Sequence, residues 1–463
     1  MKLTFWGGAK MVTGSSFLLE NDAGKRILID CGLHQGARYC EKHNFEPFPL
    51  DPASIEAVFV THAHIDHIGR IPQLYRAGFR GKIYSTPPTK DFAETLLIDS
   101  EHILSVEARE LGMPPIYELQ DINETMKLWQ KVSYHEKIET AGFEIEFYNA
   151  GHILGSASIL VKGDGKKIVF SGDLGHPVTP LIRGREEIQE ADYALIDSTY
   201  GSRIHEDQTK RKDLFEDVIK ETIKSGGVLM IPAFALERTQ ELLYELNDLV
   251  ENGRVPRVPV FVDSPLAIKL TAVYKKYSKD PIYFDEAAIE SLRAGDAIFD
   301  FPDLHLTLTT EQSKQINGIA PPKIIMAGSG MSQGGRILHH EKRYLPDPKS
   351  AILFVSFQAI GSLGRRILDG SKKAKAGGSP KDFSVKIFGE EIPVKARVLA
   401  IGGYSSHADQ PALLDWLRSM KLGLKKVFLV HGEEKEMGPL EDRIRDELAV
   451  EPVIPALRQE VIL

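Results

Sequence analysis

The stretch "VFVTHAHIDHIGR", residues 58–70, decides how the rest of the sequence is interpreted. An apolar run typical of a buried strand leads there into His62, His64, Asp66 and His67. Imidazole and carboxylate groups are common zinc ligands, and an open position on zinc admits a water that ionises near neutral pH. The short spacers let one tight loop turn His62 and His64 toward one metal and Asp66 and His67 toward a second. The stretch therefore predicts a metal centre at the end of a strand.

Other apolar runs also end in an aspartate or a histidine. The runs "RILID", "FEIEFYNAGH", "KKIVFSGD", "YALID" and "KKVFLVH" deliver Asp30, His152, Asp173, Asp197 and His431. Functional sites of α/β sheets form at the carboxyl ends of strands, so we expect these side chains to gather around the first stretch. Asp173 can bridge two ions because a carboxylate has two oxygens. Two metals about 3.5–4 Å apart can hold the attacking and leaving oxygens of a phosphoryl displacement.

Length and composition indicate a protein of several globular domains. The chain has 463 residues, of which 42% are hydrophobic and 26% charged. No run approaches the eighteen or so apolar residues of a membrane helix, so no membrane association is expected. The net charge of −8 argues against a surface coated with nucleic-acid-binding charge, although a local basic cleft remains compatible with it. Cys31 and Cys40, the two cysteines, are expected to be inert thiols in a reducing cytoplasm.

Short apolar runs alternate with amphipathic helical patterns, which predicts an α/β architecture. Residues 1–205 are rich in strand patterns, whereas 206–385 combine longer helices with strand–loop units typical of a separate parallel-sheet domain. Residues 386–463 return to the first texture. The Gly- and Lys-rich stretch 369–382 is the best candidate for a linker or exposed loop.

The metal-ligand pattern resembles a known superfamily. "THAHIDHIG", together with the later "GH", "SGDL" and "HG" elements, is similar to the metallo-β-lactamase superfamily. The resemblance implies a four-layer αβ/βα sandwich with a dinuclear zinc site along one edge. Because this superfamily includes lactamases, thioester hydrolases and nucleases, the fold alone does not determine the substrate.

The long interval between Asp197 and His407 narrows the resemblance to one branch. The motifs "IPAFALERTQELL", "VDSPLA", "MAGSGMSQGGRILHH" and "GGYSSHADQPALLDWL" resemble β-CASP nucleases, in particular prokaryotic relatives of the pre-mRNA 3′-end-processing endonuclease. Residues 206–385 would then form the inserted β-CASP domain. The flanking ranges 1–205 and 386–463 would form the metallo-β-lactamase domain.

The resemblance implies a role for each motif residue. His62, His64 and His152 would hold one Zn²⁺, and Asp66, His67 and His431 a second Zn²⁺, with Asp173 bridging the two. Asp30 would orient the ligands. Asp66, Asp173, Asp197 and His407 would be the catalytic residues, with Ser406 contacting the substrate.

The chemistry of RNA hydrolysis gives His407 and Asp197 a role of their own. Phosphodiester cleavage expels an alkoxide, which a positioned imidazolium can protonate. A neighbouring carboxylate raises the pKa of a histidine and fixes its tautomer. A purely structural hydrogen bond between the two residues is the alternative.

The Gly/Ser-rich stretch 326–340 lies between a predicted strand and a predicted helix. Backbone amides at a helix N-terminus suit phosphate, so Ser329, Ser332 and Arg336 are candidates for contacts with an RNA backbone. The alternative is a tight turn that needs glycine for packing. The glycine spacing differs from that of a dinucleotide site.

These observations predict a zinc-dependent ribonuclease that cuts single-stranded RNA by attack of a metal-bound hydroxide, leaving 5′-phosphate and 3′-hydroxyl ends. A site between two domains favours single strands, since a duplex must be admitted whole. Endonucleolytic action is expected, with 5′-to-3′ exonuclease activity of the RNase J type as the alternative. A non-catalytic scaffold is disfavoured because every ligand is present, and a small-ester hydrolase because of the insertion. A homodimer, common among relatives, is compatible with the sequence.

Overall fold

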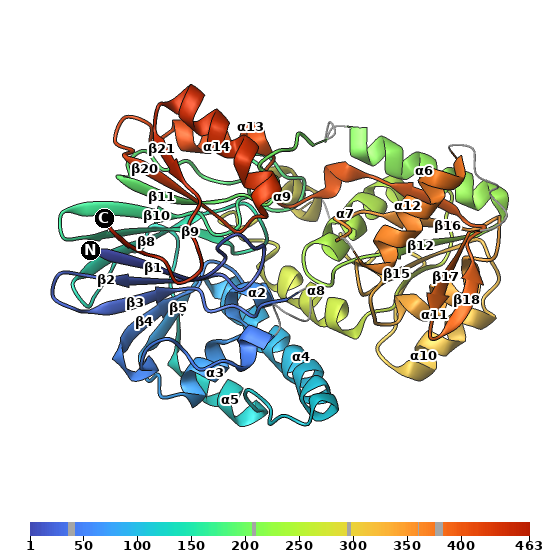
Figure 1. The fold of residues 1–463 in the computed structure, drawn as a ribbon. Helices are drawn as coiled ribbons and strands as arrows, with labels where there is room; N and C mark the ends of the chain where they lie inside the picture. The colour runs from blue at the N-terminus through green and yellow to red at the C-terminus, as the bar shows by residue number, and fades with distance from the viewer. Residues whose placement is uncertain (36–41, 206–209, 294–297, 360, 376–382) are drawn as a thin grey trace. The chain divides into compact units, whose positions relative to one another are not determined.

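The chain folds into two compact units in the computed structural model (Figure 1), which describes residues 1–35, 42–205, 210–293, 298–359, 361–375 and 383–463. The first unit consists of three segments: Met1–Ile204, Pro281–Asp285 and Ser406–Leu463. The second unit consists of two segments: His205–Asp280 and Glu286–Ser405. In sequence, the second unit is therefore an insertion into the first.

The return to the first unit lies further along the chain than the sequence suggests. Strand β19 (Arg397–Ala400) pairs in parallel with β16 (Ala351–Phe354), which makes it part of the second unit's sheet. The first unit resumes at Ser406. The structure thus places this boundary at 406 and not at 386, because a strand pattern does not reveal which sheet a strand will join.

A five-residue segment inside the insertion also belongs to the first unit. In Pro281–Asp285, Phe284 forms an antiparallel bridge with Ile182 and is buried. The backbone N–H of Arg183 donates to the carbonyl oxygen of Tyr283 at 2.9 Å. The sequence does not predict this segment, because its pairing partner lies about one hundred positions away and no periodicity marks it.

Two seven-stranded sheets form the centre of the first unit. The first sheet has the order β22 (Glu460–Ile462), β1 (Lys2–Gly7), β2 (Ser16–Glu20), β3 (Arg26–Ile29), β4 (Ile55–Phe59), β5 (Lys82–Ser85) and β6 (Trp129–Lys131). The second has the order β21 (Glu451–Val453), β20 (Lys426–Val430), β11 (Tyr193–Asp197), β10 (Lys166–Phe170), β9 (Ala157–Gly163), β8 (Phe143–Asn149) and β7 (Ile138–Thr140). In β8, "FEIEFYN", every second residue is buried, as expected for a strand with one face on a core.

The two sheets pack face to face around one apolar core. Phe59 from the first sheet lies in the same buried cluster as Phe170 and Phe428 from the second. Helices cover the outer faces (Figure 1): α3 (Ile71–Arg76), α4 (Pro87–Leu111) and α5 (Leu119–Leu128) on one side, α13 (Gln410–Arg418) and α14 (Glu434–Leu448) on the other. Trp416 and Ile444 of the latter pair are buried against the second sheet. The expected αβ/βα sandwich is confirmed.

Parallel pairing aligns the strand ends that carry the polar residues. β3 pairs in parallel with β4, and β11 pairs in parallel with both β10 and β20. Parallel neighbours end at the same edge of a sheet, so the residues that follow these strands emerge together. This edge is where the candidate site forms.

The second unit is built on a six-stranded sheet in which every pairing is parallel. Its order is β14 (Leu304–Leu306), β13 (Val260–Val262), β15 (Lys323–Ala327), β12 (Val228–Pro232), β16 and β19. The connecting helices include α6 (Arg211–Ser225), α7 (Arg238–Glu251), α8 (Pro265–Tyr277) and α11 (Ile337–Tyr344). The hairpin β17 (Ser384–Ile387) and β18 (Glu390–Pro393) packs its apolar residues on the same core. The predicted parallel-sheet domain is present.

The candidate linker 369–382 is not a loop along its whole length. Helix α12 (Leu363–Lys375) includes its first part, and 376–382 lie outside the described residues. The helix forms because Leu363 and Ile367 supply a buried apolar face. The Gly- and Lys-rich composition of the residues that follow makes this helical pattern hard to recognise in the sequence.

The predictions from overall composition concern membrane spans and cysteines. Among the helices that the structure describes, none has the length and apolar composition that a membrane span requires. Cys31 is a buried free thiol, and burial raises its pKa to about 12, which makes it unreactive as expected. Cys40 lies outside the described residues.

Candidate metal centre

The histidine-rich stretch forms a tight loop and one helical turn behind β4. His64 directly precedes α2 (Ile65–Ile68), and Asp66 and His67 lie on that turn. Gly32 lies directly against the turn. A Cβ at this position would come within 1.6 Å of the carbonyl oxygen of Asp66, so only glycine allows the approach.

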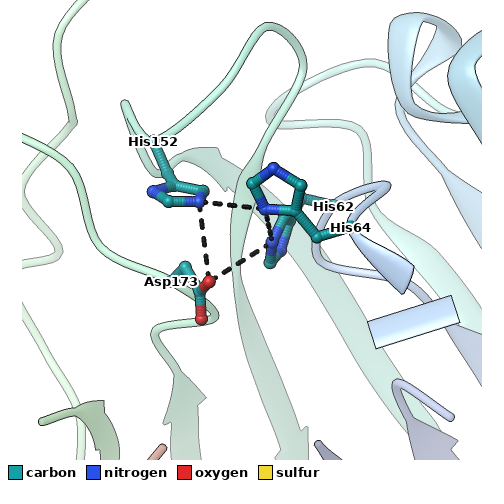
Figure 2. Close-up of side chains that lie close together, drawn as sticks. All are labelled: His62, His64, His152 and Asp173. Atoms are coloured by element: carbon teal, nitrogen blue, oxygen red, sulfur yellow. Dashed lines mark hydrogen bonds and ion pairs between the residues drawn. The ribbon is translucent and has the colours of Figure 1, made fainter. Parts of the chain in front are cut away.

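Four side chains converge in a first group, shown in Figure 2: His62, His64, His152 and Asp173. Nε2 of His62 lies 3.0 Å from Nδ1 of His64, and Nε2 of His152 lies 3.2 Å from the same atom. Oδ2 of Asp173 lies 3.4 Å from Nε2 of His62 and 3.5 Å from Nε2 of His152. The three ring nitrogens and the carboxylate oxygen therefore face one small common volume.

A second group consists of Asp66, His67 and His431. Nε2 of His431 lies 3.3 Å from Nε2 of His67 and 3.2 Å from Oδ2 of Asp66. Oδ1 of Asp173 lies 3.2 Å from Nε2 of His67. Asp173 thus presents Oδ2 to the first group and Oδ1 to the second, the arrangement that a bridging role requires.

The spacing within the groups fits zinc. With zinc–ligand bonds of about 2.0–2.1 Å in a tetrahedron, neighbouring ligand atoms lie about 3.3 Å apart. The separations of 3.0, 3.2, 3.4 and 3.5 Å in the first group scatter around that value. Imidazole nitrogens that face one another so closely form a hydrogen bond only when one carries a proton, whereas a cation between them satisfies both. The first group therefore has the donor types and spacing of a zinc site. The second has the same donor types, with separations of 3.2, 3.3 and 3.9 Å.

Asp30 contacts the ring nitrogen of His67 that faces away from the second group. Oδ2 of Asp30 lies 2.8 Å from Nδ1 of His67, which turns Nε2 of that ring toward the second group. Thr61 donates to Asp30 from its backbone N–H at 2.8 Å and from its hydroxyl at 2.7 Å. Asp30 was expected here from the sequence, whereas Thr61, which directly precedes His62, was not.

The two groups differ in their electrostatics. Burial lowers the pKa of His62 to about 3 and that of His64 to about 4, so both rings are neutral near neutral pH. Burial also lowers the pKa of His67, but neighbouring carboxylates, Asp173 above all, outweigh it and raise that pKa to about 10. The pKa of His431 is raised well above its ordinary value for the same reason. Metal binding at the second group must therefore displace protons.

Asp197 and His407 form a hydrogen-bonded pair beside the first group. Nδ1 of His407 lies 2.9 Å from Oδ2 of Asp197, within hydrogen-bond distance. Nε2 of His407 lies 3.9 Å from Oδ2 of Asp173, and the ring centroids of His407 and His152 are 4.5 Å apart. The His407 side chain is 21% exposed, whereas Asp197 is buried. Burial lowers the pKa of His407, but the Asp197 carboxylate outweighs it and raises the pKa, which favours the imidazolium.

Thr199 connects this pair with the second group. Its hydroxyl donates to Oδ1 of Asp197 at 2.7 Å and lies 3.1 Å from Nδ1 of His431. Thr199 was not among the residues expected from the sequence. The available signal was a hydroxyl two positions after a strand-ending aspartate, where it can donate back to that carboxylate.

In the Gly/Ser-rich stretch of the second unit, the structure does not support RNA contact by two of the three candidate residues. Ser332 is fully buried and its hydroxyl donates to Glu341, which contradicts the predicted RNA contact. Nη1 of Arg336 donates to Oδ1 of Asp263 at 2.8 Å, and the guanidinium also donates to two backbone carbonyl oxygens at 3.0 Å. The packing alternative thus describes Ser332 and Arg336 better. The role of the half-buried Ser329, whose hydroxyl accepts from the backbone N–H of Gln333 at 3.0 Å, stays a prediction.

Ser406 is half-buried and directly precedes His407. Its position beside the histidine is compatible with substrate contact. That role also stays a prediction.

We expect Arg336→Ala to destabilise the second unit by about 2 kcal/mol, because it removes hydrogen bonds to a buried carboxylate. Urea denaturation measures this effect. Arg365→Ala is the matched control, since Arg365 is 41% exposed and pairs with the exposed Asp369, so a change within about 0.5 kcal/mol is expected. Unchanged stability of Arg336→Ala together with weakened RNA binding would restore the RNA contact and exclude the packing role.

Comparison with protein families identifies the class to which this fold and site belong. Residues 10–214 match the metallo-β-lactamase superfamily, 239–367 match the Beta-Casp domain, and 391–455 match the Zn-dependent metallo-hydrolase RNA specificity domain. The fold and the ligand groups are thus those of a metallo-hydrolase. The chain belongs to the β-CASP family of the metallo-β-lactamase superfamily, as the motifs indicated.

Several relatives match nearly the whole chain. Ribonuclease TTHA0252 of Thermus thermophilus is 37% identical over 94% of this chain and 94% of its own. An RNase J-like protein of Methanocaldococcus jannaschii is 33% identical over 93% of this chain and 92% of its own. Cleavage and polyadenylation specificity factor subunit 3-I of Arabidopsis thaliana is 30% identical over 95% of this chain and 60% of its own. The resemblance to prokaryotic relatives of the 3′-end-processing nuclease is confirmed.

Proposed function

We propose that the protein is a zinc-dependent ribonuclease that hydrolyses phosphodiester bonds of single-stranded RNA endonucleolytically, leaving 5′-phosphate and 3′-hydroxyl ends. The observation that carries the proposal is the pair of ligand groups sharing Asp173, with the His407–Asp197 pair beside them. The ribonuclease relative of similar length supports RNA as the substrate. The scarcity of cysteine supports a reducing cytoplasm as the location.

Two zinc ions are proposed, one in each group. His62, His64, His152 and Oδ2 of Asp173 would hold the first. Asp66, His67, His431 and Oδ1 of Asp173 would hold the second. When bound, zinc supplies Lewis acidity at the phosphate and makes a water nucleophilic near neutral pH.

The chain's own residues supply the proton for the leaving group. Cleavage breaks the bond between phosphorus and the 3′-oxygen, and that oxygen must gain a proton to leave as a hydroxyl. Because Asp197 holds Nδ1 of His407, the proton available for transfer is on Nε2, which faces Asp173 at 3.9 Å. His407 therefore acts as the general acid, and Asp197 fixes its tautomer and raises its pKa.

A circular, single-stranded RNA separates this proposal from its alternative. An endonuclease linearises the circle. A 5′-to-3′ exonuclease of the RNase J type needs an end and leaves the circle intact. The RNase J-like relative is the reason to test this alternative. We expect linear products with zinc present and none after chelation. An intact circle beside degraded linear RNA would favour the exonuclease, and no loss of either RNA would contradict both.

Zinc content is expected to fall in two steps as the pH is lowered. His67 and His431 carry protons near neutral pH without metal, so each competing proton weakens zinc binding about tenfold per pH unit below its pKa. The first group is deprotonated down to about pH 5, because the pKa values of His62 and His64 lie lower. Between about pH 8 and 6, dialysed protein should lose the zinc of the second group first. Elemental analysis measures the loss.

Variants identify which zinc is released. Asp66→Ala and His431→Ala lie 365 positions apart, yet both should remove the pH-sensitive zinc and retain the other. Simultaneous release of both ions from the unaltered protein, or retention of the sensitive ion in either variant, would contradict the assignment.

A further inference from the structure

One short segment covalently links the second unit to the candidate general acid. Tyr404 belongs to the second unit, and His407, three positions later, belongs to the first. Only Ser405 and Ser406 lie between them, and Ser405 is already extended, with φ −63° and ψ 131°. Three residue steps span at most about 11 Å, which limits how far His407 can lie from Tyr404.

The Tyr404 end of this segment is anchored deep in the second unit. The side chain is fully buried, and its hydroxyl donates to Glu245. The guanidinium of Arg211 lies 4.8 Å from the centre of the Tyr404 ring and donates to the carbonyl oxygen of Gly403 at 3.1 Å. Both the ring and the backbone of this turn are therefore held by the second unit.

The anchor is a buried cluster with balanced charge. Arg211 pairs with Glu241 at 3.1 Å and with Glu245 at 2.9 Å, and Arg238 pairs with Glu241. All four side chains are at most 8% exposed. Burying four charges is costly, and apolar residues of similar size would often stabilise a fold as well. What the cluster adds is a fixed geometry around Tyr404.

The His407 end is fixed equally firmly in the first unit. The backbone N–H of Ala408 donates to the carbonyl oxygen of Leu174 at 2.6 Å, and Ala408 is buried. The backbone N–H of Leu174 in turn donates to Oδ2 of Asp197, the oxygen that holds His407. His407 is thus positioned by the residue that directly follows Asp173.

We infer that Tyr404 and its ionic cluster are positioning residues for His407, so that the second unit controls whether the general acid is in place. Because the segment is short, a shift of Tyr404 strains the backbone at His407 and weakens the Ala408–Leu174 hydrogen bond that holds it. RNA that engages the second unit can in this way influence proton transfer in the first. The inference rests on the proposed function, since it assigns a task to the same general acid.

The first test compares two conservative substitutions. Tyr404→Phe removes only the hydroxyl that donates to Glu245. Tyr274→Phe is the matched control, because Tyr274 is also fully buried in the second unit and its hydroxyl also donates to a buried glutamate, Glu237. Tyr404→Phe should cleave RNA about tenfold to a hundredfold more slowly, the range for a small misplacement of a catalytic group, whereas Tyr274→Phe should match the unaltered protein.

The leaving group distinguishes positioning from general damage. An RNA with sulfur in place of the scissile 3′-oxygen needs no proton to leave, so Tyr404→Phe should cleave it at the rate of the unaltered protein. Equal defects on both substrates, or no defect on either, would overturn the inference. If Tyr404→Phe does not fold, Glu245→Gln tests the same anchor, because it removes one charge of the cluster and keeps an acceptor for Tyr404.

Lengthening the segment tests the covalent link directly. Two glycines inserted between Ser405 and Ser406 should reproduce the defect of Tyr404→Phe on ordinary RNA. Combining both changes should add little further loss, because each interrupts the same coupling. Fully multiplicative effects would show that the anchor does not act through the segment.

Hydrogen exchange tests the anchor even if RNA is not the substrate. Exchange of the Ala408 amide should accelerate about tenfold or more in Tyr404→Phe and stay unchanged in Tyr274→Phe, because loosening the segment weakens the bond to Leu174. Accelerated exchange without any RNA cleavage would contradict the proposed function but support the positioning role of Tyr404. Unchanged exchange would contradict that positioning role, whatever the activity.

Discussion

Asp173→Ala is expected to remove zinc from both ligand groups and to slow RNA cleavage by about four orders of magnitude or more. Its two oxygens face different groups, Oδ2 at 3.4 Å from His62 and Oδ1 at 3.2 Å from His67. Burial raises the pKa of Asp173, but His431, His67 and His62 outweigh it and hold the pKa well below its usual range. The substitution therefore deletes a buried negative charge as well as a ligand of each site.

Zinc per chain and single-turnover cleavage measure this prediction together. Asp192→Asn is the matched control, because Asp192 accepts from the backbone N–H of Lys167 at 2.8 Å and pairs with Lys425. It directly precedes β11, at the opposite end of that strand from Asp197. The control should keep its zinc and its rate. Full zinc content in Asp173→Ala would exclude a bridging role, and full activity without zinc would exclude metal catalysis by these groups.

His407→Ala should retain both zinc ions and bind RNA, yet cleave about a hundredfold to ten-thousandfold more slowly, the usual range for loss of a general acid. Asp197→Asn should impair the same step, because an amide neither holds the proton-bearing tautomer nor raises the pKa of His407. His135→Ala is the control, since His135 is 52% exposed and pairs with glutamates on the surface of the same unit.

The substrate with sulfur at the scissile 3′ position reports on the proton itself. His407→Ala should cleave it at close to the rate of the unaltered protein, because a thiolate leaves without protonation. If His407→Ala is equally slow on both substrates, then His407 contacts phosphate or metal, and another group donates the proton.

The ligand groups could be predicted because their signals are local. His62, His64, Asp66 and His67 lie within one short loop, and the other ligands follow apolar runs at strand ends. Parallel pairing brings such ends to one edge, so residues far apart in sequence meet without any knowledge of the loops. The same reasoning gave the αβ/βα sandwich and the inserted parallel sheet.

The predictions that the structure does not support concern residues whose partners come from distant segments. Arg336 looked available for phosphate, but its carboxylate partner Asp263 lies 73 positions earlier. Ser332 lies in a glycine-rich loop that looked exposed, yet Glu341 on α11 accepts its hydroxyl in the interior. The return to the first unit was placed too early because β19 completes the other sheet. In each case tertiary packing determines the residue's partner or the strand's sheet, and local composition does not reveal that packing.

The decisive measurement for the proposed two-metal centre is the rate of RNA cleavage as a function of the zinc bound per chain. Metal-free protein would be titrated with zinc, and each sample divided between elemental analysis and a single-turnover assay on one RNA labelled at either end. We expect no cleavage without zinc, full cleavage only as the second equivalent binds, and internal cuts with 5′-phosphate and 3′-hydroxyl ends. Cleavage that persists in metal-free protein, or that is complete before the second equivalent binds, would contradict this expectation.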